Sequence, residues 1–187
     1  MNSPKDLLEA YLQAKDFDRP SVILETYAED AVLTYSIATD TIAFPARVVG
    51  ADAIAQTLVR DFRKKFDCCK TYYVCDSAPA AGHDIDFLPW LVIMREVSSS
   101  ALRLGKGYYR WAFAHGAEAM RVSAMHIHIE RMDVITDDDG AKRQALHDAL
   151  PYPWLPPRAL RETLARLGRQ PAFGFVADFR DPLAGPT

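Results

Sequence analysis

Two histidines and one glutamate alternate with isoleucines in a single run, His126-Ile127-His128-Ile129-Glu130. Alternate side chains of a β-strand share a face and each residue adds about 3.3 Å, so two imidazoles and a carboxylate are expected in a row, ~7 Å apart. A histidine exchanges a proton near neutral pH, and a neighbouring carboxylate can fix its tautomer. If the protein is an enzyme, this run predicts His128 and Glu130 as an acid–base pair, with His126 or Tyr109 orienting the substrate.

The same run allows two other interpretations. Met125, Ile127 and Ile129 form the more apolar face of the strand, and a sheet normally turns its apolar face inward. The histidines would then be solvated or lie at a contact between two copies of the chain. Two histidines and a carboxylate are also a ligand set for a metal centre, but all three lie on one strand, so we expect no metal here.

Aromatic residues on the predicted strands are candidates for the walls of a ligand pocket. Gly105 and Gly107 precede three aromatic residues, Tyr109, Trp111 and Phe113, on one face of a strand, which would leave room for a ligand and then enclose it. Glycines that ease strand curvature beside an aromatic core give the same pattern. Asp40 lies in a loop where a pocket acid could sit, or is a turn residue. The predicted ligand-binding residues are Tyr35, Asp40, Trp90, Tyr109 and Trp111.

Hydrophobic periodicity predicts the elements that position these residues. Ser3, Pro4 and Asp6 signal the start of a first helix, and Asp52 is expected to cap a third one. The segment 38–50 is expected to be a loop or an irregular edge strand. Helices are predicted to begin near residues 4, 20 and 51, and strands to cover about 31–37, 69–77, 87–97, 102–114 and 119–135. Three helices with one mostly antiparallel sheet indicate an α+β fold class.

The composition changes after residue 135. Of the 12 prolines, seven lie in residues 136–187, and they exclude a helix over the run PYPWLPP (151–157). Short helices are expected on either side of this run. The segment has too little apolar material for its own core. We therefore expect a domain over 1–135 and a helical, Pro-rich extension over 136–187 that packs on it.

The 187-residue chain has 22 Lys+Arg, 25 Asp+Glu, a formal net charge of −3 and 49% hydrophobic residues. This balance predicts a globular core and argues against a nucleic-acid partner. No apolar run reaches the ~18 residues of a membrane span, and the first residues carry no apolar signal segment. We therefore expect a cytoplasmic protein with no membrane partner. An odd number of cysteines, Cys68, Cys69 and Cys75, fits reduced thiols.

Two junctions between predicted elements carry a family resemblance: ETYAEDAVLTYS (25–36) and VVGADAIAQTL (48–58). Together with the element order and the two long closing strands, they resemble the nuclear transport factor 2-like superfamily, and within it the SnoaL-like group. The resemblance covers about residues 4–135. It implies a cone, in which a strongly curved sheet wraps a long helix and leaves a pocket at its open end. It also implies a homodimer formed through the sheet.

This superfamily includes ketosteroid isomerases, scytalone dehydratase, limonene-epoxide hydrolase and polyketide cyclases, as well as many proteins without catalysis, so the fold alone does not assign a function. The resemblance implies that the cone binds a small, largely apolar molecule without a metal or other cofactor. If the protein is an enzyme, we expect cofactor-free acid–base chemistry of the dehydratase, isomerase or hydrolase type. The alternative is a non-catalytic ligand-binding or accessory protein that dimerises through its sheet.

Overall fold

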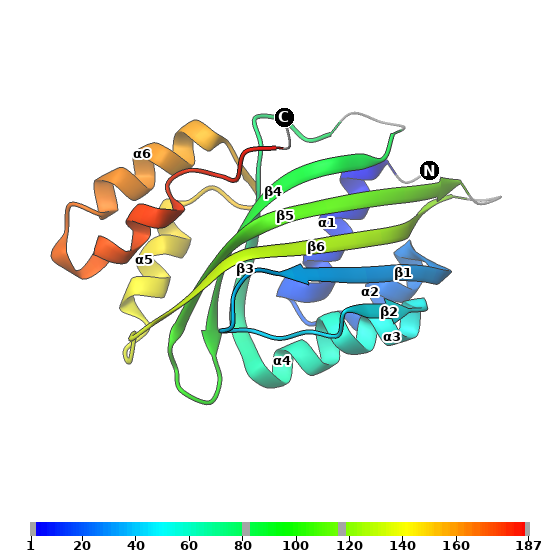
Figure 1. Cartoon of the computed structure of the whole chain (residues 1–187), viewed down its shortest axis with the longest axis horizontal. Helices are drawn as coiled ribbons and strands as arrows, with labels where there is room; N and C mark the ends of the chain where they lie inside the picture. Colours follow the sequence, from blue (N-terminus) through cyan, green and yellow to red (C-terminus); the bar gives the residue numbers. More distant parts are fainter. Residues whose placement is uncertain (1–2, 80–82, 116–118, 186–187) are drawn as a thin grey trace.

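The computed structural model describes residues 3–79, 83–115 and 119–185, and it shows one curved sheet with helices on both of its faces (Figure 1). The N-terminal helices are α1 (Pro4–Asp16), α2 (Pro20–Thr26), α3 (Ala51–Ala55), the π-helical segment η1 (Gln56–Asp61) and α4 (Phe62–Lys65). The long strands and one short edge strand are β1 (Tyr27–Ile37), β2 (Arg47–Val49), β3 (Phe66–Val74), β4 (Ile85–Glu96), β5 (Leu102–His115) and β6 (Met120–Ile135). The C-terminal segment contains α5 (Ala141–Ala149), β7 (Trp154–Leu155), α6 (Pro157–Leu167) and the 3₁₀ segment η2 (Pro171–Phe179).

The seven strands form a single sheet in the order β2-β1-β6-β5-β4-β3-β7. Neighbouring strands run antiparallel except that β1 pairs with β6, and β3 with β7, in parallel. The pair β5–β6 is paired along almost its whole length, from Leu102↔Ile135 to His115↔Met120. The predicted α+β fold class with a mostly antiparallel sheet is therefore confirmed.

The first helix begins where its sequence signals predict. Asp6 donates its backbone N–H to Ser3 Oγ at 3.2 Å, and the Asp6 carboxylate accepts the backbone N–H of Ser3 at 2.8 Å. This reciprocal pair is a capping box, and Pro4 occupies the first turn, where its missing N–H costs nothing. Leu8 and Tyr11 are buried at helical spacing, so α1 packs its apolar face into the core.

The first strand and the loop after it differ from the prediction in extent. β1 begins at Tyr27, earlier than the expected residue 31, because it follows α2 without a connecting loop. The segment 38–50, expected to be a loop or an irregular edge strand, ends in the short edge strand β2, whose residue Val49 pairs with Val32 of β1. The edge position fits the preceding Pro45, which cannot donate a hydrogen bond to a central strand.

Asp52 is not the cap of the third helix. The helix begins at Ala51, and its N-cap residue is Gly50, whose φ of 95° suits glycine. Asp52 therefore already lies in the first turn, where a negative charge is favourable, and its carboxylate contacts Arg60 at 3.3 Å. The segments α3, η1 and α4 follow one another without a break, as the predicted single helix required.

The larger hydrophobic core lies between the helices α1–α4 and the inner face of the sheet. On β4, Trp90, Val92 and Met94 belong to this core, whereas the intervening Leu91 and Ile93 belong to a second core on the outer face. Because successive side chains of a strand alternate, β4 is buried on both faces. This explains its continuous apolar sequence.

The second core forms where the C-terminal segment covers the outer face of β3, β4 and β5. Figure 1 shows α5 and α6 together at one end of the sheet. Leu146 of α5, Leu160 and Leu164 of α6, and Phe179 of η2 are buried there with Tyr72 and Leu104 of the sheet. Within residues 136–185, the buried apolar side chains thus share a core with the sheet. The division of the chain at residue 135 stays a prediction.

The helices of the described segments are short. The longest, α1, has 13 residues, and α6 has 11. No helix in the described part of the chain is long and apolar enough to span a membrane.

His147 of α5 is a buried titratable group within the C-terminal segment. It is 7% exposed, and its Nε2 lies 3.4 Å from the Ile93 carbonyl oxygen. Burial lowers the pKa of His147 from 6.5 to about 4, assisted by the positive charges of Lys70 and Arg143 and opposed by the hydrogen bond to Ile93. The unfolded chain binds this proton below about pH 6.5, so the stability contributed by neutral His147 is complete above that pH and is lost as the pH falls towards 4.

We expect the substitution His147→Gln to remove this pH dependence. Between pH 7 and pH 5, the free energy of unfolding of the wild-type protein should fall by about 2 kcal/mol more than that of the variant, because only the wild type must bury an unprotonated imidazole. Urea unfolding at the two pH values measures the difference. Equal losses in the two proteins would contradict the assignment to His147.

Candidate functional site

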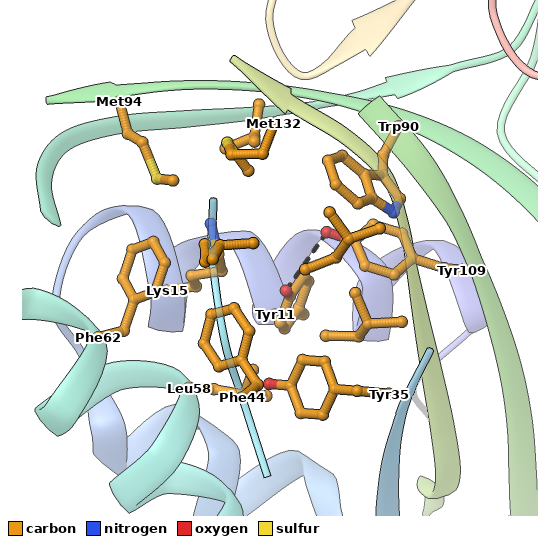
Figure 2. A pocket seen from close by; sticks show the side chains of 14 residues that line it. Tyr11, Lys15, Tyr35, Phe44, Leu58, Phe62, Trp90, Met94, Tyr109 and Met132 are labelled. Atoms are coloured by element: carbon orange, nitrogen blue, oxygen red, sulfur yellow. Dashed lines mark hydrogen bonds between the residues drawn. The ribbon is translucent and has the colours of Figure 1, made fainter. Parts of the chain in front are cut away.

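An apolar cavity lies between α1, the helical segment η1–α4 and the inner face of the sheet (Figure 2). The space that the centres of water molecules can occupy is about 40 Å³, which is room for roughly three waters. Six of the lining side chains are aromatic and most others are aliphatic, so the walls of the cavity are mainly apolar. The lining residues are Tyr11, Lys15, Tyr35, Ile42, Phe44, Leu58, Phe62, Trp90, Val92, Met94, Tyr109, Ile127, Ile129 and Met132.

Three of the five predicted ligand-binding residues, Tyr35, Trp90 and Tyr109, line this cavity. Trp111 is buried beyond it, with its ring edge-to-face against Tyr11 at 5.3 Å. Asp40 is exposed in the loop that precedes β2. Trp111 and Asp40 therefore lie outside the cavity, because the first fills space beside α1 and the second faces solvent.

Two tyrosine hydroxyls from different elements meet at one wall of the cavity. The hydroxyl oxygens of Tyr11 (α1) and Tyr109 (β5) are 3.4 Å apart (Figure 2). Trp90 stacks on Tyr109 with ring centroids 5.6 Å apart. Burial raises the pKa of Tyr11 to about 12 and raises that of Tyr109 well above its ordinary value. Both hydroxyls therefore keep their protons at neutral pH and can donate or accept hydrogen bonds.

Tyr35 of β1 brings a third hydroxyl to the cavity. Its ring stacks face to face on Phe44, with centroids 4.8 Å apart and an interplanar angle of 3°. Figure 2 shows the hydroxyl end of Tyr35 directed among the lining side chains, on the side of Phe44 and Leu58. Its buried oxygen has no hydrogen-bond partner among the described residues. Leaving such a group unpartnered costs about 1–3 kcal/mol, so this hydroxyl is a candidate contact for a ligand.

Lys15 places an ammonium group at the cavity. Its side chain is 8% exposed, and Nζ donates to Thr71 Oγ1 at 2.9 Å and contacts Cys69 Sγ at 3.1 Å and Asp16 Oδ1 at 3.4 Å. Burial opposes the charge on Lys15, but Cys69 and Asp16 outweigh it, so the pKa of Lys15 lies above its ordinary value. Burial also raises the pKa of the Cys69 thiol to about 12. Because burial favours the protonated thiol, the acidic side chain that pairs with Lys15 is that of Asp16.

The Asp16 carboxylate links the cavity to the C-terminal segment. Its side chain has no exposed surface (0%). It accepts the backbone N–H and the hydroxyl of Thr71 at 2.7 and 3.0 Å, and the hydroxyl of Tyr152 at 3.1 Å. A buried charge is tolerated when it is paired and hydrogen-bonded in this way. The segment after β6 therefore helps to hold the charge pair beside the cavity.

A β-bulge in β6 decides which of its side chains reach the cavity. The register with β5 slips at Glu130, which is the extra residue of the bulge. Strict alternation predicts Met132 on the same face as the histidines, and this prediction is wrong. The bulge turns Met132 inward, where it lines the cavity together with Ile129.

The histidines of β6 lie on the outer face of the sheet. Met125, Ile127 and Ile129 occupy the inner face and are 1%, 6% and 3% exposed, as the first alternative interpretation anticipated. His126 and His128 are half-buried on the other side, and Glu130 is exposed. The structure brings these three side chains together, since His128 Nε2 lies 3.0 Å from Glu130 Oε2 and both histidines contact Ser36. It does not bring them to the cavity, and their catalytic roles stay predictions.

The described lining of the cavity offers hydrogen-bond donors, but no carboxylate or imidazole that could accept a proton near neutral pH. Its ionisable lining residues are Lys15 and three tyrosines, and the pKa of each is raised. No aspartate, glutamate or histidine belongs to the lining described by the structure. Within residues 3–79, 83–115 and 119–185, no group of three or more His, Cys, Asp and Glu side chains is arranged to hold a metal ion.

Two polar lining residues of the cavity, Tyr11 and Lys15, are not predicted as site residues from the sequence. The available signal is that Lys15 continues the apolar stripe of α1, at a position where a lysine is rarely buried unless paired. Its partner Thr71 lies 56 residues away in the sequence. A contact of that separation has no local sequence signature.

No protein-family model matches the chain, and no curated protein matches its sequence. Solved structures match its fold. LinA is 13% identical with a TM-score of 0.58, and the match covers 71% of this chain and 86% of LinA. A nuclear transport factor 2-like superfamily protein from Salmonella enterica serovar Typhimurium is 12% identical with a TM-score of 0.53, covering 72% and 89%. A ketosteroid isomerase-like protein from Erwinia carotovora atroseptica is 14% identical with a TM-score of 0.53, covering 69% and 95%.

The chain therefore has the nuclear transport factor 2-like fold, as the sequence resemblance predicted. At these identities the likeness extends to the fold alone, and one fold supports many functions. The function must therefore be inferred from the side chains of the cavity and of the outer face.

Two glycines of β5 give a matched test of the cavity wall. A Cβ on Gly107 would overlap the backbone carbonyl of His128 and the Trp90 ring, whereas a Cβ on Gly105 would meet the flexible end of Met132. We expect Gly107→Ala to lower the free energy of unfolding by about 3 kcal/mol and Gly105→Ala by about 1 kcal/mol, because only the methionine can rotate away. Urea unfolding measures both. Equal losses would show that the wall near Gly107 is not rigid.

Proposed function

We propose that the protein binds a small, largely apolar molecule that carries an oxygen acceptor, in the cavity between α1 and the sheet. The observation that carries this proposal is the unpartnered hydroxyl of Tyr35 in an aromatic-walled space. Tyr11 and Tyr109 add two more hydroxyls to the same lining. A carbonyl or ether oxygen of the ligand would accept a hydrogen bond there, while its apolar body contacts the rings.

Two contributions to the binding free energy favour such a ligand over water in the cavity. Apolar contact contributes about 25 cal/mol for each Å² removed from water. A hydrogen bond to Tyr35 would relieve part of the ~1–3 kcal/mol that an unpartnered buried hydroxyl costs. Lys15 already has three polar partners and pairs with Asp16, so it adds little preference for an anion. These terms together favour a neutral ligand.

Entry of a ligand requires the lining to move, because the open space is about 40 Å³. Ile42, Phe44 and Phe62 line both the cavity and a neighbouring surface hollow, so these side chains separate the two. Ile42 and Phe44 lie in the loop between β1 and β2, where fewer backbone hydrogen bonds resist displacement. Met94 and Met132 can adapt on the opposite side, since methionine side chains repack readily.

Acid–base catalysis inside the cavity receives less support. One protein of similar fold is named ketosteroid isomerase-like, and that name applies to that protein. Here the described lining has no carboxylate or imidazole to accept a proton, and the raised pKa of Lys15 keeps it charged. Ligand binding without catalysis in the cavity fits these groups best. Catalysis by His126, His128 and Glu130 would take place on the other face of the sheet.

A homodimer and a cytoplasmic location stay predictions. The C-terminal segment covers the outer face of β3 and β4 with the second core. A dimer formed through the sheet would therefore have to use the remaining outer surface, over β1, β6 and the adjoining part of β5.

The substitution Tyr35→Phe separates ligand binding from stability. It removes only an unpartnered hydroxyl, so the free energy of unfolding should stay unchanged or rise by up to about 1 kcal/mol. The matched control is Tyr73→Phe, which removes a buried hydroxyl that donates to the Leu8 carbonyl at 2.8 Å. This control should lose about 1 kcal/mol of stability and leave ligand affinity unchanged, because Tyr73 does not line the cavity.

The affinity measurement compares 1-tetralone with tetralin, which have the same ring skeleton with and without a carbonyl oxygen. Intrinsic tryptophan fluorescence reports binding, because Trp90 lines the cavity. We expect the ketone to bind more tightly, and Tyr35→Phe to weaken the ketone about fivefold without affecting tetralin. If neither compound perturbs the fluorescence or the melting temperature of the wild type, the proposal is wrong.

A further inference from the structure

Polar side chains of two parallel strands face each other on the outer side of the sheet. In the β1–β6 pair, Thr34 lies opposite His126, and Ser36 lies opposite His128. All four residues are half-buried, so they are accessible in part from solvent. The cavity lies on the opposite face, which makes this a separate group of side chains.

A continuous chain of hydrogen bonds runs through these residues to Glu130. Thr34 Oγ1 lies 2.8 Å from His126 Nδ1, and His126 Nε2 lies 2.9 Å from Ser36 Oγ. Ser36 Oγ also lies 2.7 Å from His128 Nδ1, and His128 Nε2 lies 3.0 Å from Glu130 Oε2. Both nitrogens of each imidazole therefore have a partner.

Glu130 determines the direction of every hydrogen bond in this chain. An ionised carboxylate only accepts, so His128 Nε2 carries a proton and Nδ1 of the neutral ring is the acceptor. Ser36 has one hydroxyl proton, which it donates to His128 Nδ1, so it accepts from His126 Nε2. His126 Nδ1 is then left to accept from Thr34. With both histidines neutral, this is the assignment in which every group is satisfied.

Ser36, His128 and Glu130 consequently stand in the order of nucleophile, base and orienting carboxylate. Tyr108 of β5 stacks on His128 with centroids 4.7 Å apart and an interplanar angle of 24°, which restricts rotation of the imidazole ring. The side chains of His128 and Glu130 are 18% and 46% exposed. A reagent in solvent can therefore approach the base and the hydroxyl that it contacts.

A surface hollow next to the hydrogen-bond chain provides a place for a substrate. His126, the apolar residues Val32, Ala112 and Ala124, and Arg110 are among its lining residues. Ser36 is not in this lining, but its hydroxyl contacts His126, which is. The space open to water centres there is about 190 Å³. Arg110 has no carboxylate within 4.0 Å among the described residues, so its charge is available to an oxygen that becomes negative during a reaction.

We propose that Ser36 is the nucleophile of a site on the outer face, where it accepts the acyl group of a small, neutral ester. Asp84 and Asp86 also line the hollow, and their charges disfavour an anionic acyl group. This proposal is independent of ligand binding in the cavity.

Ester hydrolysis at this site would proceed in two steps, with His128 carrying the proton in each. Ser36 Oγ forms a bond to the acyl carbon as its proton passes to His128 Nδ1, and the ester C–O bond breaks as the leaving oxygen takes that proton. A water molecule then attacks the acyl carbon and gives its proton to His128, and Ser36 Oγ regains a proton as the carboxylic acid departs. The Glu130 carboxylate accepts from Nε2 throughout and stabilises the imidazolium that forms in each step.

A fluorophosphonate probe tests the nucleophile directly. Attack by Ser36 Oγ would form an O–P bond and displace fluoride while the proton passes to His128. By intact mass and peptide mapping, we expect one phosphonyl group on Ser36 of the wild type and none at this position in Ser36→Ala. An unlabelled Ser36, or equal total labelling of wild type and Ser36→Ala, overturns the proposal.

The substitution Glu130→Gln tests the carboxylate, because it removes the charge and keeps the shape. We expect the labelling rate at neutral pH to fall at least about tenfold with no change in melting temperature. Glu162→Gln is the matched control: it makes the same change at an exposed carboxylate of α6 that pairs with Arg158, so the rate should stay within about twofold. An unchanged rate in Glu130→Gln, or an equal fall in Glu162→Gln, would contradict the assignment of nucleophile, base and carboxylate.

Discussion

The bulge at Glu130 is the distortion on which both faces of β6 depend. In a regular strand each face receives every second residue, whereas the extra residue here lets Ile129 and Met132 both face inward. Glu130 itself stays outside, where it reaches His128 at 3.0 Å. Gly107 of the neighbouring strand passes so close to the His128 carbonyl that no side chain fits. One backbone irregularity thus shapes the cavity wall and the hydrogen-bond chain on the outer face.

The pair Lys15–Asp16 gives the C-terminal segment a role in building the cavity. Lys15 is a buried cation, and without a partner its desolvation would be strongly unfavourable. Asp16 supplies the partner only because Thr71 and Tyr152 hold its carboxylate. Tyr152 is 136 residues away from Asp16 in the sequence. The polar side of the cavity therefore depends on α1, β3 and the segment after β6 together, and the extension contributes to the site as well as to the second core.

Local signals in the sequence predicted most elements, because capping and periodicity act over a few residues. The capping box of Ser3 and the period of two in the long strands are such signals. Which face of β6 turns inward is a property of the tertiary structure, since a strand in this sheet can have partners on both sides. Periodicity could not reveal the inward Met132, because a bulge is a register slip between strands. Nor could it pair Lys15 with Thr71, which is 56 residues away in the sequence.

The two faces of β6 offer different chemistry although their side chains are one residue apart. On the inner face, burial raises the pKa of the lining tyrosines, so their protons stay in place and binding rests on apolar contact and hydrogen bonding. On the outer face, burial and then the charge of Arg110 lower the pKa of His126, which keeps this imidazole neutral and able to pass a hydrogen bond to Ser36 at neutral pH. The two proposals therefore assign proton transfer to the outer face and ligand binding to the inner one. Because solved structures at 12–14% identity share only the backbone arrangement, this separation rests on the side chains of this chain.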